Sequence, residues 1–78
     1  MKKKLRHFIF QELIFVADPD SFSDDDDLLA AGLNSIGIMR LIMYIETAFG
    51  VTLPDAEITV ENLQTLNLLA QWIKGHQA

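Results

Sequence analysis

Hydrophobic residues recur at helical spacing in the first part of the chain. Four of them are spaced to lie on one face of a helix: Leu5, Ile9, Leu13 and Val16. This spacing fits a helical repeat better than the alternation expected of a strand. The predicted helix ends near Ala17, because Pro19 disfavours helical backbone at the residue before it.

A second helix is predicted from Asn34 or Ser35 to Gly50. Asparagine and serine are favoured at a helix N-cap, and glycine is favoured just past a helix end. Five apolar residues form the predicted core stripe of this helix: Ile38, Met39, Ile42, Ile45 and Phe49. Between the two helices lie a polar loop at 18–27, which holds six aspartates, and an apolar segment at 28–33 that we expect to pack on the core.

The C-terminal third predicts a connector and a last helix. Residues 51–54 read as an extended connector and residues 56–58 as a short helical turn. Residues 59–63 lead into a helix that runs to about Lys74 and is stopped by Gly75. The periodic apolar residues of this helix are Leu66, Leu69, Ala70 and Ile73. The whole pattern predicts an all-α fold, a small three- to four-helix bundle with a long loop between the first two helices, and a single domain over residues 1–78.

Composition excludes several kinds of chemistry. The 78 residues include no cysteine and only two histidines, His7 and His76. Without cysteine the chain can form no disulfide, thiolate metal site or thiol nucleophile of its own. We therefore expect no enzymatic activity and no metal site.

The charge is unevenly distributed. Six basic and 11 acidic residues give a net charge of −5, and four of the basic residues lie in the first seven positions. From Phe8 onward the balance is 2 basic against 11 acidic residues, or −9. An acidic body repels nucleic-acid phosphates and attracts basic protein partners. We therefore expect protein partners and no nucleic acid.

No stretch of the sequence reads as a membrane or targeting segment. The apolar stretch 8–17 is interrupted by Gln11 and Glu12, and the apolar run 36–45 contains Arg40 and is short of the roughly 20 residues that a membrane span needs. We expect a soluble, cytoplasmic protein that does not bind membranes.

The aspartate-rich loop does not match the pattern of an EF-hand calcium site. In the EF-hand pattern started at Asp18, the fifth position is Phe22 and the bidentate glutamate position is Leu29. Starts at Asp24 and Asp25 also fail. A solvated loop is the favoured interpretation, with a divalent-cation-binding regulatory domain at residues 24–27 left as an alternative.

Ser35 and its neighbours stand out at the start of the second helix. A serine here is ordinarily a helix cap, but Asn34 caps equally well, and Ile38 stands where a capping box would need a glutamate. No base is evident to activate Ser35, so any covalent modification needs an outside enzyme. A helix start also favours an attached phosphate.

The second helix carries more apolar residues than one buried stripe needs. Ile36 and Met43 lie seven residues apart on one face that begins beside Ser35. This face is either covered by loops or serves as a docking strip for partners, to which the adaptable side chain of methionine is suited.

These residues resemble a known family. The segment DLLAAGLNSI at 27–36, followed by a helix that ends FGVTLP at 49–54, resembles the phosphopantetheine-binding acyl and peptidyl carrier proteins. The resemblance runs from about Phe8 to Ile73. The closing GHQA at 75–78 is similar to the end of bacterial fatty-acid carriers.

The resemblance implies a free-standing carrier and no catalyst. It implies that a phosphopantetheinyl transferase attaches the 4'-phosphopantetheine arm of coenzyme A to Ser35. The arm then carries acyl or aminoacyl groups as thioesters, in biosynthesis of the fatty-acid, polyketide or nonribosomal-peptide type. A loading enzyme and a downstream synthase or transferase would be the further partners of a monomeric carrier.

The resemblance also assigns partner contacts. It implies that Ile36 and Met43 are apolar contacts and that Glu46 and Asp55 meet basic partners. Two residues depart from the fatty-acid carriers, which usually have an aspartate where Asn34 stands and an acid where Arg40 stands. Asn34 favours a nonribosomal or other specialised pathway, and Arg40 favours a partner surface that is less electrostatic and more apolar than that of the fatty-acid carriers. An unmodified helical adaptor that binds through the Ile36 and Met43 strip remains the alternative from another class.

Overall fold

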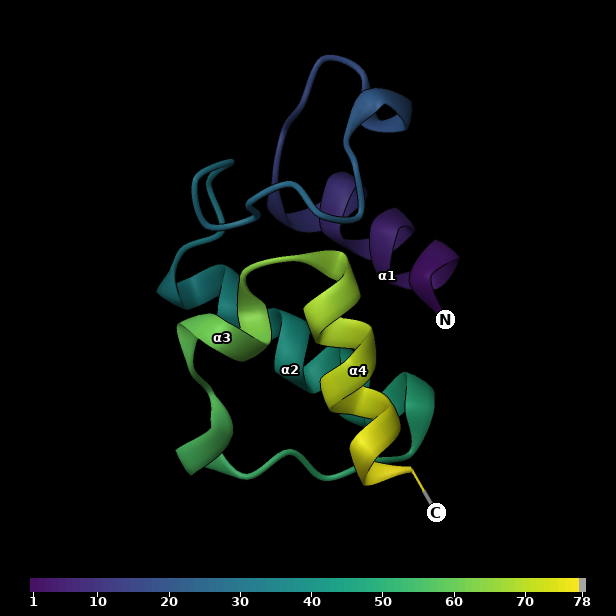
Figure 1. Cartoon of the computed structure of the whole chain (residues 1–78), viewed down its shortest axis with the longest axis vertical. Coiled ribbons are helices and arrows are strands. Elements are labelled where there is room, and N and C mark those ends of the chain that lie inside the picture. Colours follow the sequence, from purple (N-terminus) through teal and green to yellow (C-terminus); the bar gives the residue numbers. More distant parts are fainter. Residues whose placement is uncertain (78) are drawn as a thin grey trace.

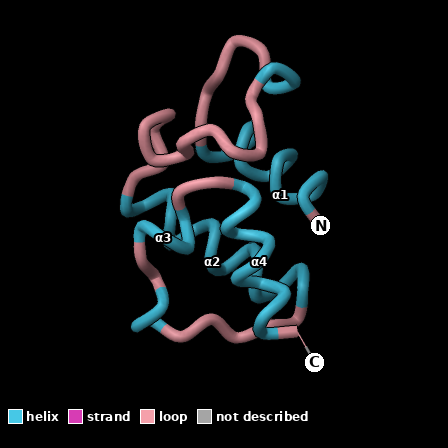
Figure 2. The backbone as a smooth tube through the Cα atoms, in the orientation of Figure 1, coloured by secondary structure: helices cyan, strands magenta, loops and turns pink. Residues whose placement is uncertain are grey.

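The structure, a computed structural model, describes residues 1–77 and is helical there, with no strand in that range. Its seven elements, drawn in Figures 1 and 2, are α1 (Lys2–Phe8), η1 (Ile9–Leu13), η2 (Pro19–Ser21), α2 (Ser35–Phe49), η3 (Asp55–Glu57), α3 (Val60–Leu63) and α4 (Leu66–His76). α4 packs against α1 and α3, and α2 packs against η1. The all-α class and the long loop before α2 are confirmed.

The first helix ends at Leu13, earlier than the predicted end near Ala17. η1 is a wider, π-helical turn, closed where the Ile14 N–H donates to the Ile9 carbonyl over 2.9 Å. Ile14 then adopts extended backbone (φ −130°, ψ 132°) and is buried, while Phe15 is 91% exposed. The chain leaves the helix because extended backbone buries Ile14 against the core.

α2 has the predicted bounds, but its buried face differs from the predicted stripe. Leu41, Ile42 and Ile45 are buried, whereas Met39 is 55% exposed. Met39 is rotated about 100° around the helix axis from Ile38, so it lies outside the face centred on Ile45. Leu41 takes its place in the core.

Where the sequence predicts one last helix, the structure has two, α3 and α4. Thr65 interrupts it and caps α4, since its hydroxyl oxygen accepts the Leu68 N–H at 3.0 Å. Gly75 does not stop α4, which continues to His76. The short turn η3 begins one residue earlier than expected, at Asp55.

The core draws on every long helix and on the loop. Its largest fully buried side chains are Leu5, Ile9, Leu28, Leu41, Ile45, Leu66, Leu69 and Ile73. Leu28, in the apolar segment that precedes α2, is completely buried, and Leu33 is 5% exposed. The predicted packing of this segment on the core is confirmed.

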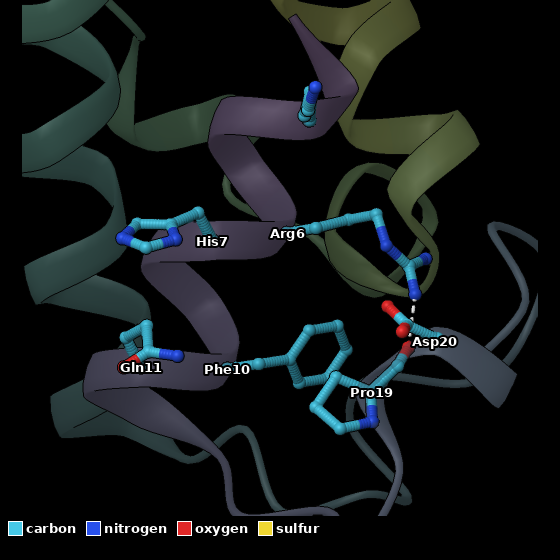
Figure 3. Close-up of a pocket in the computed structure, with 7 residues that line it drawn as sticks. Arg6, His7, Phe10, Gln11, Pro19 and Asp20 are labelled. Atoms are coloured by element: carbon cyan, nitrogen blue, oxygen red, sulfur yellow. Dashed lines mark hydrogen bonds between the residues drawn. The ribbon is translucent and has the colours of Figure 1, made fainter.

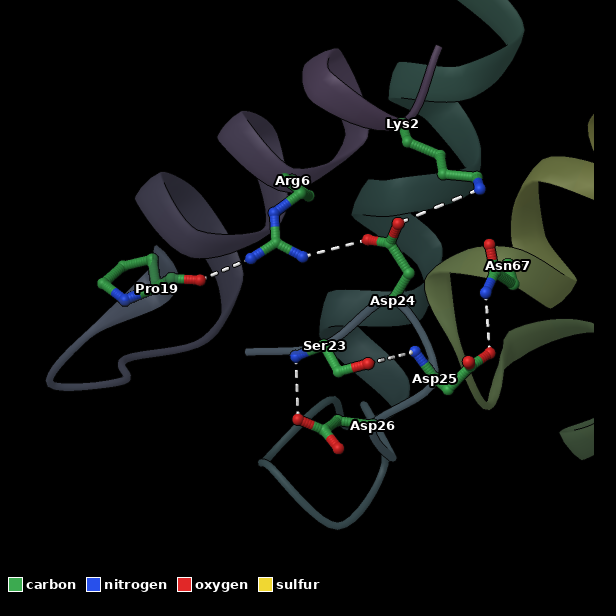
Figure 4. Close-up of polar contacts among 8 residues, drawn as sticks. All are labelled: Lys2, Arg6, Pro19, Ser23, Asp24, Asp25, Asp26 and Asn67. Atoms are coloured by element: carbon green, nitrogen blue, oxygen red, sulfur yellow. Dashed lines mark hydrogen bonds and ion pairs between the residues drawn. The ribbon is translucent and has the colours of Figure 1, made fainter. Parts of the chain in front are cut away.

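Asp24 fastens the aspartate-rich loop to α1 (Figure 4). Its carboxylate lies 3.1 Å from the Arg6 guanidinium and 3.8 Å from the Lys2 ammonium. Arg6 also donates to the Pro19 carbonyl and lies over the Phe10 ring. Two of the four N-terminal cations are therefore used inside the molecule.

The next three aspartates hold the rest of the loop. Asp25 accepts from the Asn67 amide of α4 at 2.6 Å, and Asp26 accepts from the Ser23 N–H at 2.8 Å. Asp27 accepts from the Ala30 N–H and from the Gln64 amide. Within residues 1–77, no three His, Cys, Asp or Glu side chains are arranged to hold a metal ion. The loop aspartates act as hydrogen-bond acceptors that tie the loop down.

Candidate functional site at the start of helix α2

The segment before α2 is a tight turn anchored at both ends. The Leu28 N–H donates to the Gln64 carbonyl at 2.7 Å, and the Leu33 N–H donates back to the Leu28 carbonyl at 3.0 Å. Gly32 has a φ of +121°, which side-chain-bearing residues rarely adopt. The turn therefore delivers the chain to Asn34 from a fixed position on the core.

Asn34 is the N-cap of α2. Its side-chain oxygen accepts the Gly37 N–H at 2.9 Å, and its carbonyl accepts the Ile38 N–H at 2.8 Å. A Cβ atom at Gly37 would lie 3.2 Å from the Leu33 side chain and 3.5 Å from the Asn34 side-chain oxygen. The absence of a side chain at Gly37 thus lets the capping side chain and Leu33 approach the helix closely.

Ser35 is the first residue of α2 and is exposed to solvent. Of the two capping candidates left open by the sequence, Asn34 is the cap, and no hydrogen bond among residues 1–77 uses the Ser35 hydroxyl. The N–H groups of Ser35 and Ile36 have no partner within the helix, because the first turn has no preceding carbonyls. The first turn also contains no acidic residue. The Ser35 hydroxyl therefore sits exposed at the positive end of a helix.

An apolar face of α2, formed by Ile36, Met39 and Met43, begins next to Ser35. These side chains are 75%, 55% and 67% exposed, and no loop covers them. The spacing of three and four residues places all of them on one side of the helix. The sequence analysis identified Ile36 and Met43 on this face but assigned Met39 to the core. The signal that could have placed Met39 here is its spacing, three residues after Ile36 and four before Met43.

The other residues predicted to meet partners are not gathered on this face. Arg40 lies beside it and is already paired, with 3.4 Å between its guanidinium and the Glu12 carboxylate. Glu46 accepts the Leu53 N–H at 2.9 Å and so supports the connector after α2. Asp55 is exposed at the start of η3, in another part of the fold.

Comparison with known proteins identifies the family. The family model described as "Phosphopantetheine attachment site" matches residues 9–73, which include the turn, Ser35 and the apolar face. The chain belongs to the phosphopantetheine-binding carrier proteins. Members of this family hold a covalently attached 4'-phosphopantetheine group and carry substrates for other proteins.

Several curated proteins resemble this carrier protein. A D-alanyl carrier protein of Streptococcus suis is 39% identical over 59 residues, which are 76% of this chain and 73% of the relative. An acyl carrier protein of Micrococcus luteus is 40% identical over 58 residues, 74% of this chain and 63% of the relative. An aminoacyl carrier protein of Agrobacterium fabrum is 31% identical over 55 residues, 70% of this chain and 66% of the relative.

Solved structures share the fold of this carrier protein. One is from a complex of an Agrobacterium tumefaciens carrier protein with an engineered Bradyrhizobium japonicum glycine:carrier protein ligase and AMP. It has a TM-score of 0.82 and 25% identity, and the match covers 95% of this chain and 99% of the other. A second match, from a Bradyrhizobium japonicum ligase complex with a glycylated carrier protein, has a TM-score of 0.70 and 28% identity and covers 91% and 90% of the two chains.

The start of α2 suits the family's cofactor. An exposed hydroxyl and nearby N–H donors favour an attached phosphodiester, and a carboxylate in the same turn would weaken that attraction. Ser35 supplies the hydroxyl, the first-turn N–H groups of α2 are the donors, and that turn contains no acid. No helix in the described part of the carrier is long and apolar enough to cross a membrane.

Proposed function

We propose that Ser35 is the attachment point of the 4'-phosphopantetheine arm. The observation that carries this proposal is its exposed hydroxyl at the start of α2, inside the segment that matches the family model. The Asn34 cap holds the helix start in place, and the first-turn N–H groups of Ser35 and Ile36 would attract a phosphate on Ser35. When bound, the arm supplies the thiol that this cysteine-free chain lacks.

Attachment requires a separate enzyme. In the transfer, the Ser35 oxygen forms a bond to the phosphorus next to the pantetheine of coenzyme A, and 3',5'-adenosine diphosphate leaves. The serine proton has to pass to a base, and no side chain among residues 1–77 hydrogen-bonds to the Ser35 hydroxyl. A phosphopantetheinyl transferase therefore supplies the base, and the carrier itself has no catalytic role in our proposal.

We propose an aminoacyl group as the cargo, loaded by an ATP-dependent aminoacyl ligase. Three observations support this class: the D-alanyl and aminoacyl carrier relatives, and the fold match to carriers bound to glycine ligases. Arg40, where fatty-acid carriers usually have an acid, supports a partner other than a fatty-acid enzyme. The Micrococcus luteus acyl carrier relative favours a second candidate, an acyl group.

The attachment site is tested by intact mass. The purified carrier is incubated with coenzyme A, Mg²⁺ and a broad-specificity phosphopantetheinyl transferase. We expect wild type and a Ser23→Ala control to gain one phosphopantetheine group, and Ser35→Ala to gain none while its circular dichroism stays helical. A gain in Ser35→Ala would place the attachment elsewhere.

Failure of wild type is also informative. Should two independent transferases leave the wild-type mass unchanged, the same reactions with Asn34→Asp would show whether Asn34 blocks recognition. If that variant also stays unmodified, the proposal is wrong and an unmodified adaptor becomes the better interpretation.

A further inference from the structure

A groove lies between α1 and α2, formed by two hollows that share Tyr44. The first, of about 500 Å³, is lined by Lys3, Lys4, His7, Tyr44 and Ala48. The second, of about 370 Å³, is lined by Phe8, Arg40, Met43, Tyr44 and Thr47. We call these two hollows together the α1–α2 groove.

An aromatic pair forms the floor of the groove. The Phe8 and Tyr44 rings are stacked, with 4.1 Å between their centroids and an interplanar angle of 8°. Phe49 contacts the Tyr44 ring edge-on, at 6.3 Å between centroids. The Tyr44 hydroxyl also donates to the Lys4 carbonyl at 3.5 Å. These contacts hold α1 and α2 together, so the floor exists before any partner binds.

The charges around the groove are of one sign. Its lining contains Lys3, Lys4 and Arg40 and no carboxylate. Arg40 is paired with Glu12, whereas neither lysine makes an ion pair with another residue in the range 1–77. The groove is therefore a basic site on a chain that carries −9 from Phe8 onward, Arg40 included.

The neighbouring side of α1, next to Pro19 and Asp20, is different (Figure 3). A hollow of about 380 Å³ there is also lined by Lys3 and His7, but it contains the carboxylate of Asp20. Arg6 in this hollow is already bonded to the Pro19 carbonyl. Here the Asp20 carboxylate offsets one of the cations, whereas the lining of the α1–α2 groove contains cations and no carboxylate.

We propose that the α1–α2 groove binds an acidic amphipathic helix of a partner protein. Glutamate or aspartate side chains of that helix would pair with Lys3 and Lys4, and its apolar face would cover Phe8 and Tyr44. Met43 belongs both to the groove and to the apolar face of α2, so a partner docked on that face reaches the groove without a gap. The groove does not include Ser35, and the inference does not depend on the proposed attachment site.

An acidic protein segment fits this groove better than nucleic acid or anionic lipid does. Nucleic-acid binding draws most of its affinity from several Lys and Arg contacts to phosphates, whereas only two lysines of the groove are unpaired. Polybasic membrane sites use about 4–8 clustered cations, and the acidic body would be repelled by anionic lipid. An aromatic floor with two flanking cations matches a short apolar segment with a few carboxylates.

The test uses designed peptides and charge-reversed carriers. The probe is a fluorescein-labelled amphipathic helix with leucine and phenylalanine on one face and flanking glutamates. A twin peptide has lysine in place of every glutamate. Anisotropy titrations compare wild type with the Lys3→Glu/Lys4→Glu double variant and with Lys74→Glu, an exposed control on α4. Circular dichroism and phosphopantetheine loading by mass check that the double variant stays folded and functional.

We expect the acidic peptide to bind wild type and Lys74→Glu equally, to bind the double variant about tenfold more weakly, and to lose affinity with salt. Amide NMR shifts with the acidic peptide should centre on Lys4, Tyr44 and Thr47, and the lysine twin should cause no shifts in the groove. Equal binding to all three carriers, shifts outside the groove, or no binding of the acidic peptide would overturn the proposal. Phosphatidylserine vesicles that bind wild type and not the double variant, with no peptide binding, would assign the groove to lipid instead.

Discussion

The aspartate-rich loop and the apolar face of α2 both lie on the surface, but they differ in what their side chains contact. The polar loop bonds to the rest of the chain, and the apolar face is open to solvent. The loop is the most polar segment, yet each aspartate from 24 to 27 accepts a hydrogen bond or ion pair from within the chain. The face formed by Ile36, Met39 and Met43 is apolar, yet more than half of each of its side chains is exposed. The charged segment is thus used for folding, and the apolar one is left open for partners.

This contrast separates two uses of surface residues. Leu28 and the loop aspartates fix the turn that leads into α2, so the loop determines where Ser35 lies. Ile36, Met39 and Met43 contribute little to that position, because more than half of each side chain is exposed to solvent. Substitutions in the loop should therefore change stability, and substitutions on the apolar face should change binding.

The largest stability effect is expected at Leu28. Its side chain is completely buried although it belongs to a loop. Truncation with Leu28→Ala should lower the free energy of unfolding by about 3 kcal/mol, because a buried cavity replaces the side chain. Urea denaturation measures this change, with Met43→Ala as the control of similar size on a helix. Equal losses in both variants would contradict the contrast between loop and helix face.

The sequence predicts the fold correctly where clear end signals and one apolar stripe define a helix. α2 has its predicted bounds because Asn34 and Gly50 are strong end signals, and Gly50 has the left-handed φ of +65° that favours glycine. The early end of the first helix was not predictable from apolar periodicity alone. Leu13, Ile14 and Val16 suit either a longer helix or an extended segment, and only the core that buries Ile14 decides between them.

In the candidate site, too, some features follow from local sequence signals and others depend on tertiary packing. Ser35, Ile36 and Met43 were found from spacing and resemblance, and Met43 is exposed as expected. Met39 was misassigned because its spacing fits two faces, and the choice depends on how α2 is rotated against the rest of the core. The intramolecular roles of Arg40 and Glu46 depend on Glu12 and Leu53, which only the fold brings to them.

The cap at Asn34 gives the next effect. Asn34→Ala should cost about 1 kcal/mol of stability, because the Gly37 N–H loses its acceptor. Ser35→Ala should change stability by less than about 0.5 kcal/mol, since its hydroxyl is exposed and caps nothing. Thermal or urea unfolding of the two variants checks the order. A larger loss in Ser35→Ala than in Asn34→Ala would show that Ser35 shares the cap.

Acid should weaken the fold through Asp27 and Glu57. The Ala30 N–H and then the Gln64 amide keep the pKa of Asp27 below its ordinary value. Hydrogen bonds from Trp72 and then His76 lower the pKa of Glu57 in the same way. Because both folded-state pKa values are lowered, the stability these groups contribute is present above their unfolded pKa values, roughly pH 4. It is lost as the pH falls through the folded values.

Urea midpoints measured from pH 6 downward test this expectation. The fall below about pH 4 should be smaller in Asp27→Asn and in Glu57→Gln than in wild type, because each variant removes one titrating group. Asp55→Asn, at an exposed acid at the start of η3, is the control that makes the same chemical change. A profile unchanged in both test variants would mean that these hydrogen bonds do not form in solution.

The smallest stability effect is expected on the apolar face itself. Met43→Glu should change the free energy of unfolding by less than about 0.5 kcal/mol, because Met43 is 67% exposed. The same variant should reduce partner-enzyme kcat/KM about tenfold, since a charge would be buried at an apolar contact. Gln71→Glu, which adds the same charge on an exposed position of α4, is the matched control for both measurements. A drop in melting temperature with Met43→Glu would place Met43 in the core, and unchanged kinetics in a stable variant would show that partners dock elsewhere.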